Sequence, residues 1–242
     1  MTERGMIFNA EMVRAILDGR KTQTRREVKL NLDISCLATT YDWATSLAAN
    51  HYQALTEEQI QQKAESLRGV IHPVILGNGQ MVSIICPHGK PGDRIWVRET
   101  FCPVDDTQYG GEKWVDYRAT PKFEASHPAG WDCTPNDAEA LKWRPSIHMP
   151  RWASRILLEI TNVGVQRLQD ISSGDAVREG ICQLPASGRY CISPGDQYFG
   201  GASHSAKEVY SWLWSSIYGE ESWKANPWVW VISFERVEGG AA

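Results

Sequence analysis

The sequence predicts an α+β fold: a mixed β-barrel with flanking helices and with insertions between its strands. Two observations indicate this class. A short amphipathic segment at residues 9–18 leads through a basic turn into strand-like sequence, and residues 95–101 and 227–237 alternate as strands do. The chain has 242 residues, of which 42% are apolar and 22% charged, so it can bury a sizeable core. We therefore expect a single domain over residues 1–242.

The first elements are a short strand at residues 5–8 and a helix at residues 9–18. Apolar residues recur in this helix at helical spacing: Met12, Ala15 and Ile16. Asn9 is a favourable N-cap residue, and Gly19 can end the helix in a left-handed turn. The chain should therefore leave the helix in a fixed direction.

The run from Gly19 to Arg26 concentrates charge directly after this helix. It carries four cations and two hydroxyls, namely Arg20, Lys21, Arg25, Arg26, Thr22 and Thr24. Since the helix ends on a defined turn, Lys21 and Thr24 are placed as a binding or catalytic site requires. The alternative is a solvated basic turn, which is the ordinary role of such a run.

Residues 28–88 differ in character and are interpreted as an insertion into the barrel. One helix is expected at residues 42–49. A second is expected at residues 56–68, where Thr56 and Gln59 form a capping box. Its apolar face is formed by Ile60, Ala64 and Leu67, and Gly69 ends it.

Three strands are expected after the insertion, at residues 95–101, 113–119 and 155–165. In the first of them the side chains alternate, with Ile95 and Val97 on one face and Trp96 and Arg98 on the other. Between the second and third strands, residues 121–145 are polar and irregular, with one short helix expected at residues 136–141.

The C-terminal third should contain a long loop, a helix and a strand. Residues 183–203 are rich in Gly, Ser and Pro, and we expect a loop that acts as a lid, because long loops are often functional. Ser205 and Glu208 cap the next helix, whose expected buried stripe is Val209, Trp212, Leu213, Ser216 and Ile217. Residues 227–237 are apolar on both faces, which is typical of a central barrel strand.

Composition argues against several kinds of function. The chain has 25 cations and 29 anions, a net charge of −4, which disfavours a broad nucleic-acid-binding surface but permits a local basic cleft. No apolar run reaches the length of a membrane span and the N-terminus does not resemble a signal peptide, so we expect a cytoplasmic protein. The six cysteines contain no C-x-x-C pair and are expected as free thiols. Cys86 and His88 lack a second close pair, so no metal or other cofactor is expected.

The run from Gly19 to Arg26 resembles the G-[RK]-K-T-x-T-x-R hallmark of the ASCH domain, a PUA-like β-barrel family. Residues 168–181 resemble the family's short helix ending in A-x-x-E, which places Glu179 at its last position, and the G-D-x-x-x-V-R pattern ending at Arg98 resembles a family strand. The run from His148 to Trp152 is similar to larger prophage-encoded ASCH-type proteins. The resemblance covers about half of the chain.

The resemblance implies an activity as well as a fold. The small bacterial N4-acetylcytidine amidohydrolases of this family use a Lys, a Thr and a Glu, which correspond here to Lys21, Thr24 and Glu179. One mechanism has Thr24 as the nucleophile, Lys21 as the general base and Glu179 as the proton relay. Neighbouring cations would lower the pKa of Lys21, as a base requires. The other mechanism has water as the nucleophile, activated by Glu179, with Lys21 and Thr24 holding the acyl oxygen.

The expected substrate is an N4-acylated cytidine or a related modified nucleoside, hydrolysed at a C–N amide bond without a metal. Trp96 and Tyr117 are candidates to stack on its base, with core packing as the alternative. Further candidate contacts are Thr22, Arg25, Arg26, Arg98 and Arg155. Two other classes of function stay open. One is a PUA-like module that binds RNA or a modified base without catalysis, and the other is a ribonuclease.

Overall fold

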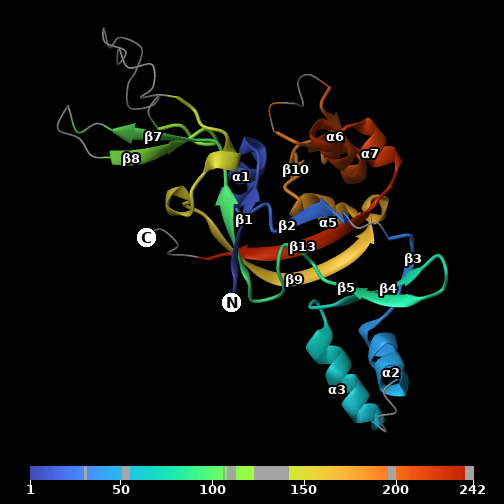
Figure 1. The fold of residues 1–242 in the computed structure, drawn as a ribbon. Helices are drawn as coiled ribbons and strands as arrows, with labels where there is room; N and C mark the ends of the chain where they lie inside the picture. Colours follow the sequence, from blue (N-terminus) through green and yellow to red (C-terminus); the bar gives the residue numbers. More distant parts are fainter. Residues whose placement is uncertain are drawn as a thin grey trace.

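The structure, a computed structural model, describes residues 1–29, 32–50, 55–105, 107, 113–122, 142–193, 195 and 200–237. Its centre is a five-stranded mixed sheet with the order β1-β6-β9-β13-β2 (Figure 1). The strands are β1 (Glu3–Ile7), β6 (Arg94–Arg98), β9 (Leu157–Arg167), β13 (Trp228–Arg236) and β2 (Gln23–Glu27). Only β1 and β6 among them are parallel. The α+β class predicted from the sequence is confirmed.

The described strands form open sheets, so the prediction of a closed barrel is wrong for this part of the chain. The two edge strands β1 and β2 are not paired as neighbours in the sheet. Instead, the Arg26 guanidinium on β2 donates a hydrogen bond of 2.7 Å to the Ile7 carbonyl at the end of β1. We call the gap between these two edges the seam.

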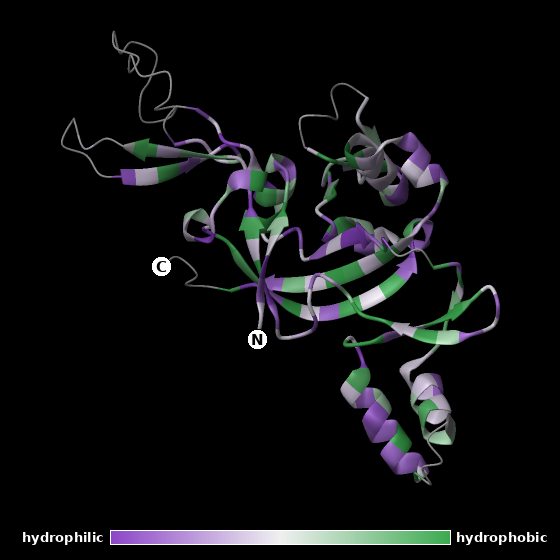
Figure 2. Cartoon of the chain, in the orientation of Figure 1, coloured by the Kyte–Doolittle hydropathy of each residue, from purple (hydrophilic) through white to green (hydrophobic). Residues whose placement is uncertain are grey.

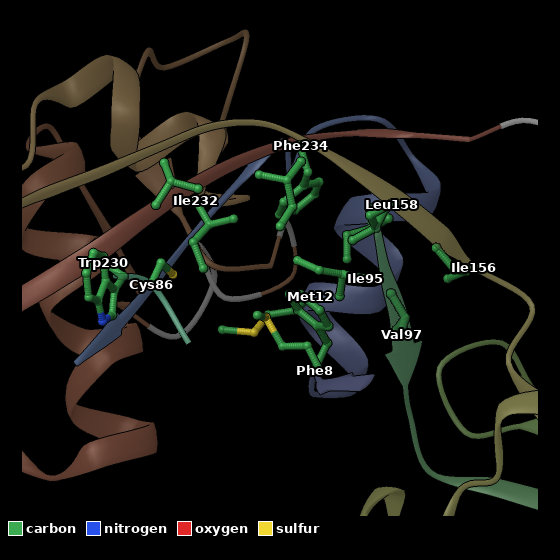
Figure 3. Packing of buried hydrophobic residues seen from close by; sticks show 14 of the residues in the cluster. Phe8, Met12, Cys86, Ile95, Val97, Ile156, Leu158, Trp230, Ile232 and Phe234 are labelled. Atoms are coloured by element: carbon green, nitrogen blue, oxygen red, sulfur yellow. The ribbon is translucent and has the colours of Figure 1, made fainter. Parts of the chain in front are cut away.

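Strand β13 lies at the centre of the packing, as its apolar faces predicted. On one face, Trp230, Ile232 and Phe234 join a core that includes Phe8, Ile95 and Leu158 (Figure 3). On the other face, Val229 and Val231 pack with the helices of the C-terminal half. Since β13 pairs with β9 on one side and β2 on the other, both faces and both edges are covered.

Helix α1 (Ala10–Leu17) connects β1 to β2 and is capped as predicted. The Asn9 side chain accepts a hydrogen bond of 2.8 Å from the Met12 amide. Gly19 has a φ of +73°, the left-handed conformation expected of it. The buried face of α1 packs on the main core through Met12, Val13 and Ile16. The helix therefore fixes where Lys21 and β2 begin.

The region expected to be an insertion forms a separate sheet and a helical hairpin. Its strands are β3 (Ile34–Leu37), β4 (His72–Leu76) and β5 (Met81–Ile84), and its helices are α2 (Thr40–Asn50) and α3 (Glu57–Leu67). Both expected helices and the Thr56–Gln59 capping box are confirmed. The hairpin projects away from the main sheet in Figure 1, and Figure 2 shows that α3 is largely hydrophilic.

Strands β7 (Phe101–Asp105) and β8 (Lys113–Tyr117) form a separate hairpin that also projects from the main sheet (Figure 1). The helix expected at residues 136–141 lies outside the described residues. Two 3₁₀ turns, Ser146–His148 and Arg151–Ala153, then lead the chain into β9.

Two expectations for the C-terminal half are corrected. Residues 183–203 contain ordered strands rather than only a loop: β11 (Tyr190–Cys191) pairs with β10 (Cys182–Gln183) and β12 (Ala202–Ser203). In α6 (Ala206–Tyr218) the buried residues include Tyr210 and Trp214, whereas Trp212 and Ile217 are exposed. The buried stripe is rotated because α7 (Glu220–Lys224) covers that side of α6: its Ser222 hydroxyl accepts a hydrogen bond from Trp214, and Trp223 contacts Tyr210.

Candidate functional site

Lys21 and Glu179 lie in contact in the folded protein. The Lys21 ammonium donates to the Glu179 carboxylate at 2.7 Å and to the Glu179 backbone carbonyl at 2.8 Å. The other carboxylate oxygen accepts a hydrogen bond of 3.0 Å from Arg25. The carboxylate of Glu179 is thus held between two cations, and the three side chains form a buried ion cluster.

Helix α5 (Ser173–Arg178), strand β2 and the residues that lead into β2 position this cluster. Glu179 is the C-cap of α5, whose N-cap Ser172 accepts a hydrogen bond from the Asp175 amide. Gly180 follows with a φ of +107°, and a Cβ there would lie 3.0 Å from the Ala15 Cβ. Only glycine tolerates both conditions, so the chain can turn closely against α1 at this point.

The cluster is closed to solvent. The side chains of Lys21 and Arg25 are 0% exposed and that of Glu179 is 2% exposed. Burial lowers the pKa of Lys21 below 10.5, and the Glu179 carboxylate opposes that shift. Asp175 lies 3.7 Å from Arg25 and also pairs with the exposed Arg178 at 2.9 Å. This hydrogen-bonded ion cluster holds α5 against β2.

Thr24 is not part of this cluster. It pairs with Ile232, whose side chain lies in the main core, whereas Arg25 pairs with Val231 on the opposite face of the sheet. Because neighbouring strand residues face opposite sides, Thr24 points away from Lys21 and Glu179. The structure therefore brings together two of the three expected catalytic residues, buried, and leaves the third on the other face of β2.

A cleft opens at the seam, on the face of β2 that carries Thr24 and Arg26. Two pockets of about 390 and 430 Å³ share Arg26, His88 and Tyr218 as lining residues, and we call them together the seam cleft. The first pocket also includes Lys29, Ile85 and Trp230, and the second includes Met6, Met12 and Arg98. Each volume lies within the range of small-molecule sites, about 300–1,000 Å³.

Arg26 is held firmly at the centre of the seam cleft. Its guanidinium donates to the Tyr218 hydroxyl at 3.1 Å and to the Ile7 carbonyl at 2.7 Å, and it lies 5.4 Å from the centroid of the Phe8 ring. Burial, together with the positive charges of Arg26 and Arg4, lowers the pKa of His88 to about 4. His88 is therefore neutral at neutral pH and can both donate and accept hydrogen bonds. A fixed cation beside a neutral imidazole and aromatic rings suits a polar, planar ligand.

The remaining predicted contacts lie in different places. Arg98 lines the seam cleft and lies 5.4 Å from the ring of Trp96, which packs over Gly5. Arg155 instead forms two hydrogen bonds with the buried Glu99 and lies 3.9 Å from the Tyr117 ring. Tyr117 and Arg155 thus belong to a structural cluster beside β7 and β8. The Thr22 amide donates to the Arg178 carbonyl, and the Thr22 carbonyl accepts from the Phe234 amide.

The sequence interpretation missed two residues of the cleft. The sequence indicates His88 only as a possible metal ligand and gives no signal for Tyr218, because neither residue is near Arg26 in the sequence.

Among the described residues, no group of three or more His, Cys, Asp or Glu side chains is arranged to hold a metal ion. No helix in the described part of the chain has the length and apolarity to cross a membrane. The chain matches no protein-family model, and comparisons with curated proteins and with solved structures give no match either.

Proposed function

We propose that this protein is a PUA-like, ASCH-type module that binds a modified nucleoside in the seam cleft. The observation that carries the proposal is the position of Arg26, which belongs to the motif resembling the ASCH hallmark and lies at the centre of the cleft. The curled sheet, whose edges approach at the seam, also supports a PUA-like arrangement.

The chemistry of the cleft suits an acylated pyrimidine nucleoside. Arg26 offers donors to the carbonyl oxygens of a base, and neutral His88 offers one further donor or acceptor. Met6 and Met12 provide an adaptable apolar wall for an acyl methyl group. The proposed ligand is an N4-acylated cytidine or a close relative, as a free nucleoside or within RNA.

A calorimetric titration with N4-acetylcytidine, cytidine and uridine tests this proposal. We expect N4-acetylcytidine to bind about tenfold or more tightly than cytidine, because filling an apolar subsite with a small group contributes about 1–3 kcal/mol. Equal affinity for all three nucleosides, or no binding of any, would contradict the proposal.

Amide hydrolysis is a second candidate, and the position of Thr24 favours it. Thr24 lies on the same face of β2 as Arg26, two residues away, which corresponds to about 7 Å along a strand. Its side chain is therefore on the same side of the strand as the cleft, although it is buried and does not line the two pockets. Lys21 and Glu179 lie on the opposite face, so hydrolysis would require their rearrangement. Binding is the better supported function for this reason.

Release of acetate from N4-acetylcytidine without added metal tests the second candidate. Thr24→Val removes the hydroxyl while keeping the volume of the side chain. If Thr24 attacks the amide, this variant should lose turnover by about 100-fold or more and keep its affinity for cytidine. Turnover that survives Thr24→Val would instead make water the nucleophile. A wild-type protein that binds but never releases acetate would leave binding as the function.

A further inference from the structure

One stretch of this acidic protein has a strongly basic composition. From Lys142 to Leu158 the chain contains four cations and no acidic residue, although the whole protein has a net charge of −4. The cations are Lys142, Arg144, Arg151 and Arg155, and two tryptophans, Trp143 and Trp152, lie among them. Apart from the buried Met149, residues 142–152 lie at the surface around the two 3₁₀ turns, and we call them the 142–152 surface.

Trp152 is exposed although its turn is fixed. Its side chain is 68% exposed, whereas the next two residues, Ala153 and Ser154, are buried. The Tyr117 hydroxyl donates to the Ala153 carbonyl at 3.0 Å, and the Ser154 hydroxyl donates to the Val97 carbonyl at 2.8 Å. The exposure of Trp152 therefore does not result from a loose chain. A rigidly presented, exposed indole ring is a feature of binding surfaces.

Guanidinium groups and aromatic rings are interleaved over this surface. Arg118 lies 5.5 Å from the ring of Trp143. Arg98 donates a hydrogen bond to the carbonyl of Ile147, a residue that is itself 60% exposed. Positive charges that follow a phosphate backbone, combined with rings on which bases stack, are the two elements of a site for single-stranded nucleic acid.

The 142–152 surface is continuous with the seam cleft. Arg98 contacts Ile147 and also lines the cleft beside Ile7. Arg151 pairs with Glu3 at 2.9 Å, and Glu3 and Ile7 lie on the same face of β1. Since they are four residues apart, the path from Arg151 to the cleft along β1 is about 13 Å, the length of a few nucleotides.

We propose that the 142–152 surface binds a single-stranded nucleic acid, with Trp152 stacking on one base and Arg98 and Arg144 facing its phosphates. The proposal goes beyond the proposed function, and it rests on that function only in placing another nucleotide of the same strand in the seam cleft. A single strand is required because the bases of a duplex are already stacked on one another and cannot stack on an indole ring. Arg151 and Arg155 are already paired with Glu3 and Glu99, so Arg98 and Arg144 supply the positive charge with which a protein of net negative charge would hold a polyanion.

Fluorescence anisotropy with labelled single-stranded RNA and DNA of about 10 nucleotides, and with the matching duplexes, tests this proposal. We expect the wild type to prefer single strands, and the comparison of RNA with DNA shows whether the 2′-hydroxyl contributes to binding.

Trp152→Ala should weaken single-strand binding by about tenfold, and Trp152→Phe should retain most of it. Trp212→Ala, which removes an exposed tryptophan of α6, is the matched control and should have no effect. Arg144→Ala should reduce the slope of log affinity against log salt by about 0.7.

The outcomes separate this proposal from the proposed function. Strand binding that depends on Trp152, in a protein that binds no nucleoside, would support this surface and contradict the proposed function. Normal nucleoside binding with strand binding unaffected by Trp152→Ala and Arg144→Ala would overturn only the present proposal. Self-association that depends on Trp152, with no effect on strand binding, would also overturn it, because the surface would then be a contact between copies of the chain.

Discussion

Lys21 and Glu179, 158 positions apart in the sequence, form an ion pair of 2.7 Å that is closed to solvent. The pair joins the start of β2 to the C-terminal end of α5, and Arg25 completes it from the same face of β2. Its burial and its hydrogen bonds are what a structural cluster requires. They are unfavourable for a catalytic pair, which has to meet a substrate.

Removing the charge of Glu179 should therefore destabilise the fold. Glu179→Gln leaves Lys21 and Arg25 buried without their main counter-ion, and we expect a loss of about 3–5 kcal/mol in the free energy of unfolding. Urea denaturation measures this loss. Glu221→Gln, at an exposed pair with Lys224, is the matched control and should change stability by less than about 1 kcal/mol. A Glu179→Gln variant as stable as the control would contradict the structural role of the cluster.

The position of Thr24 could have been predicted from the sequence. Lys21 and Thr24 are three residues apart, and in an extended segment such residues face opposite sides, whereas Lys21 and Arg25 face the same side. The resemblance to a motif grouped Lys21 with Thr24, and strand alternation separates them. Contacts between distant segments, such as that of Tyr218 with Arg26, leave no local pattern, so only the structure reveals them.

Local signals were sufficient wherever the determinant was local. The Asn9 cap, the Thr56–Gln59 capping box and the alternation of β13 all depend on residues close in sequence, and all three are confirmed. The predicted buried stripe of α6 was wrong because the side that is buried depends on α7, which packs against one side of the helix. Barrel closure was likewise wrong, since it depends on whether β1 and β2 pair, and these edges are joined by a side chain instead.

Two tryptophans of α6 test its corrected orientation. Trp214 is buried and its indole donates to Ser222, so Trp214→Ala should lower the free energy of unfolding by about 3–5 kcal/mol. Trp212 is exposed, and Trp212→Ala should cost less than about 1 kcal/mol. Thermal or urea denaturation of both variants provides the measurement. A larger loss for Trp212→Ala than for Trp214→Ala would instead support the buried stripe expected from the sequence.

His72 should make stability depend on pH. Burial lowers its pKa from 6.5 to about 4, so between these values the unfolded chain binds more protons than the folded protein. The free energy of unfolding is therefore not reduced by the protonation of His72 above about pH 6.5, and it decreases as the pH falls toward 4.

His72→Phe removes this dependence and also removes a buried Nε2 atom that has no hydrogen-bond partner in the described structure. The new ring can keep the edge-on contact with Trp230, now 5.1 Å between centroids. We expect the variant to be more stable than the wild type, with a gain at about pH 5 that exceeds the gain at about pH 7 by about 1 kcal/mol. Urea denaturation at both values measures the difference, and equal gains would show that His72 titrates alike in both states.

The most direct test of the binding account is the dissociation constant of N4-acetylcytidine for the wild type and for Arg26→Gln, measured by calorimetry. Arg236→Ala, at the exposed end of β13, serves as the control, and thermal denaturation establishes that each variant is folded. If Arg26 is the central contact of the seam cleft, Arg26→Gln should weaken binding by about tenfold or more, since a charged hydrogen bond contributes about 1.5–3 kcal/mol, while the control binds as the wild type does. Equal affinity of all three folded proteins would contradict the account and place the ligand elsewhere.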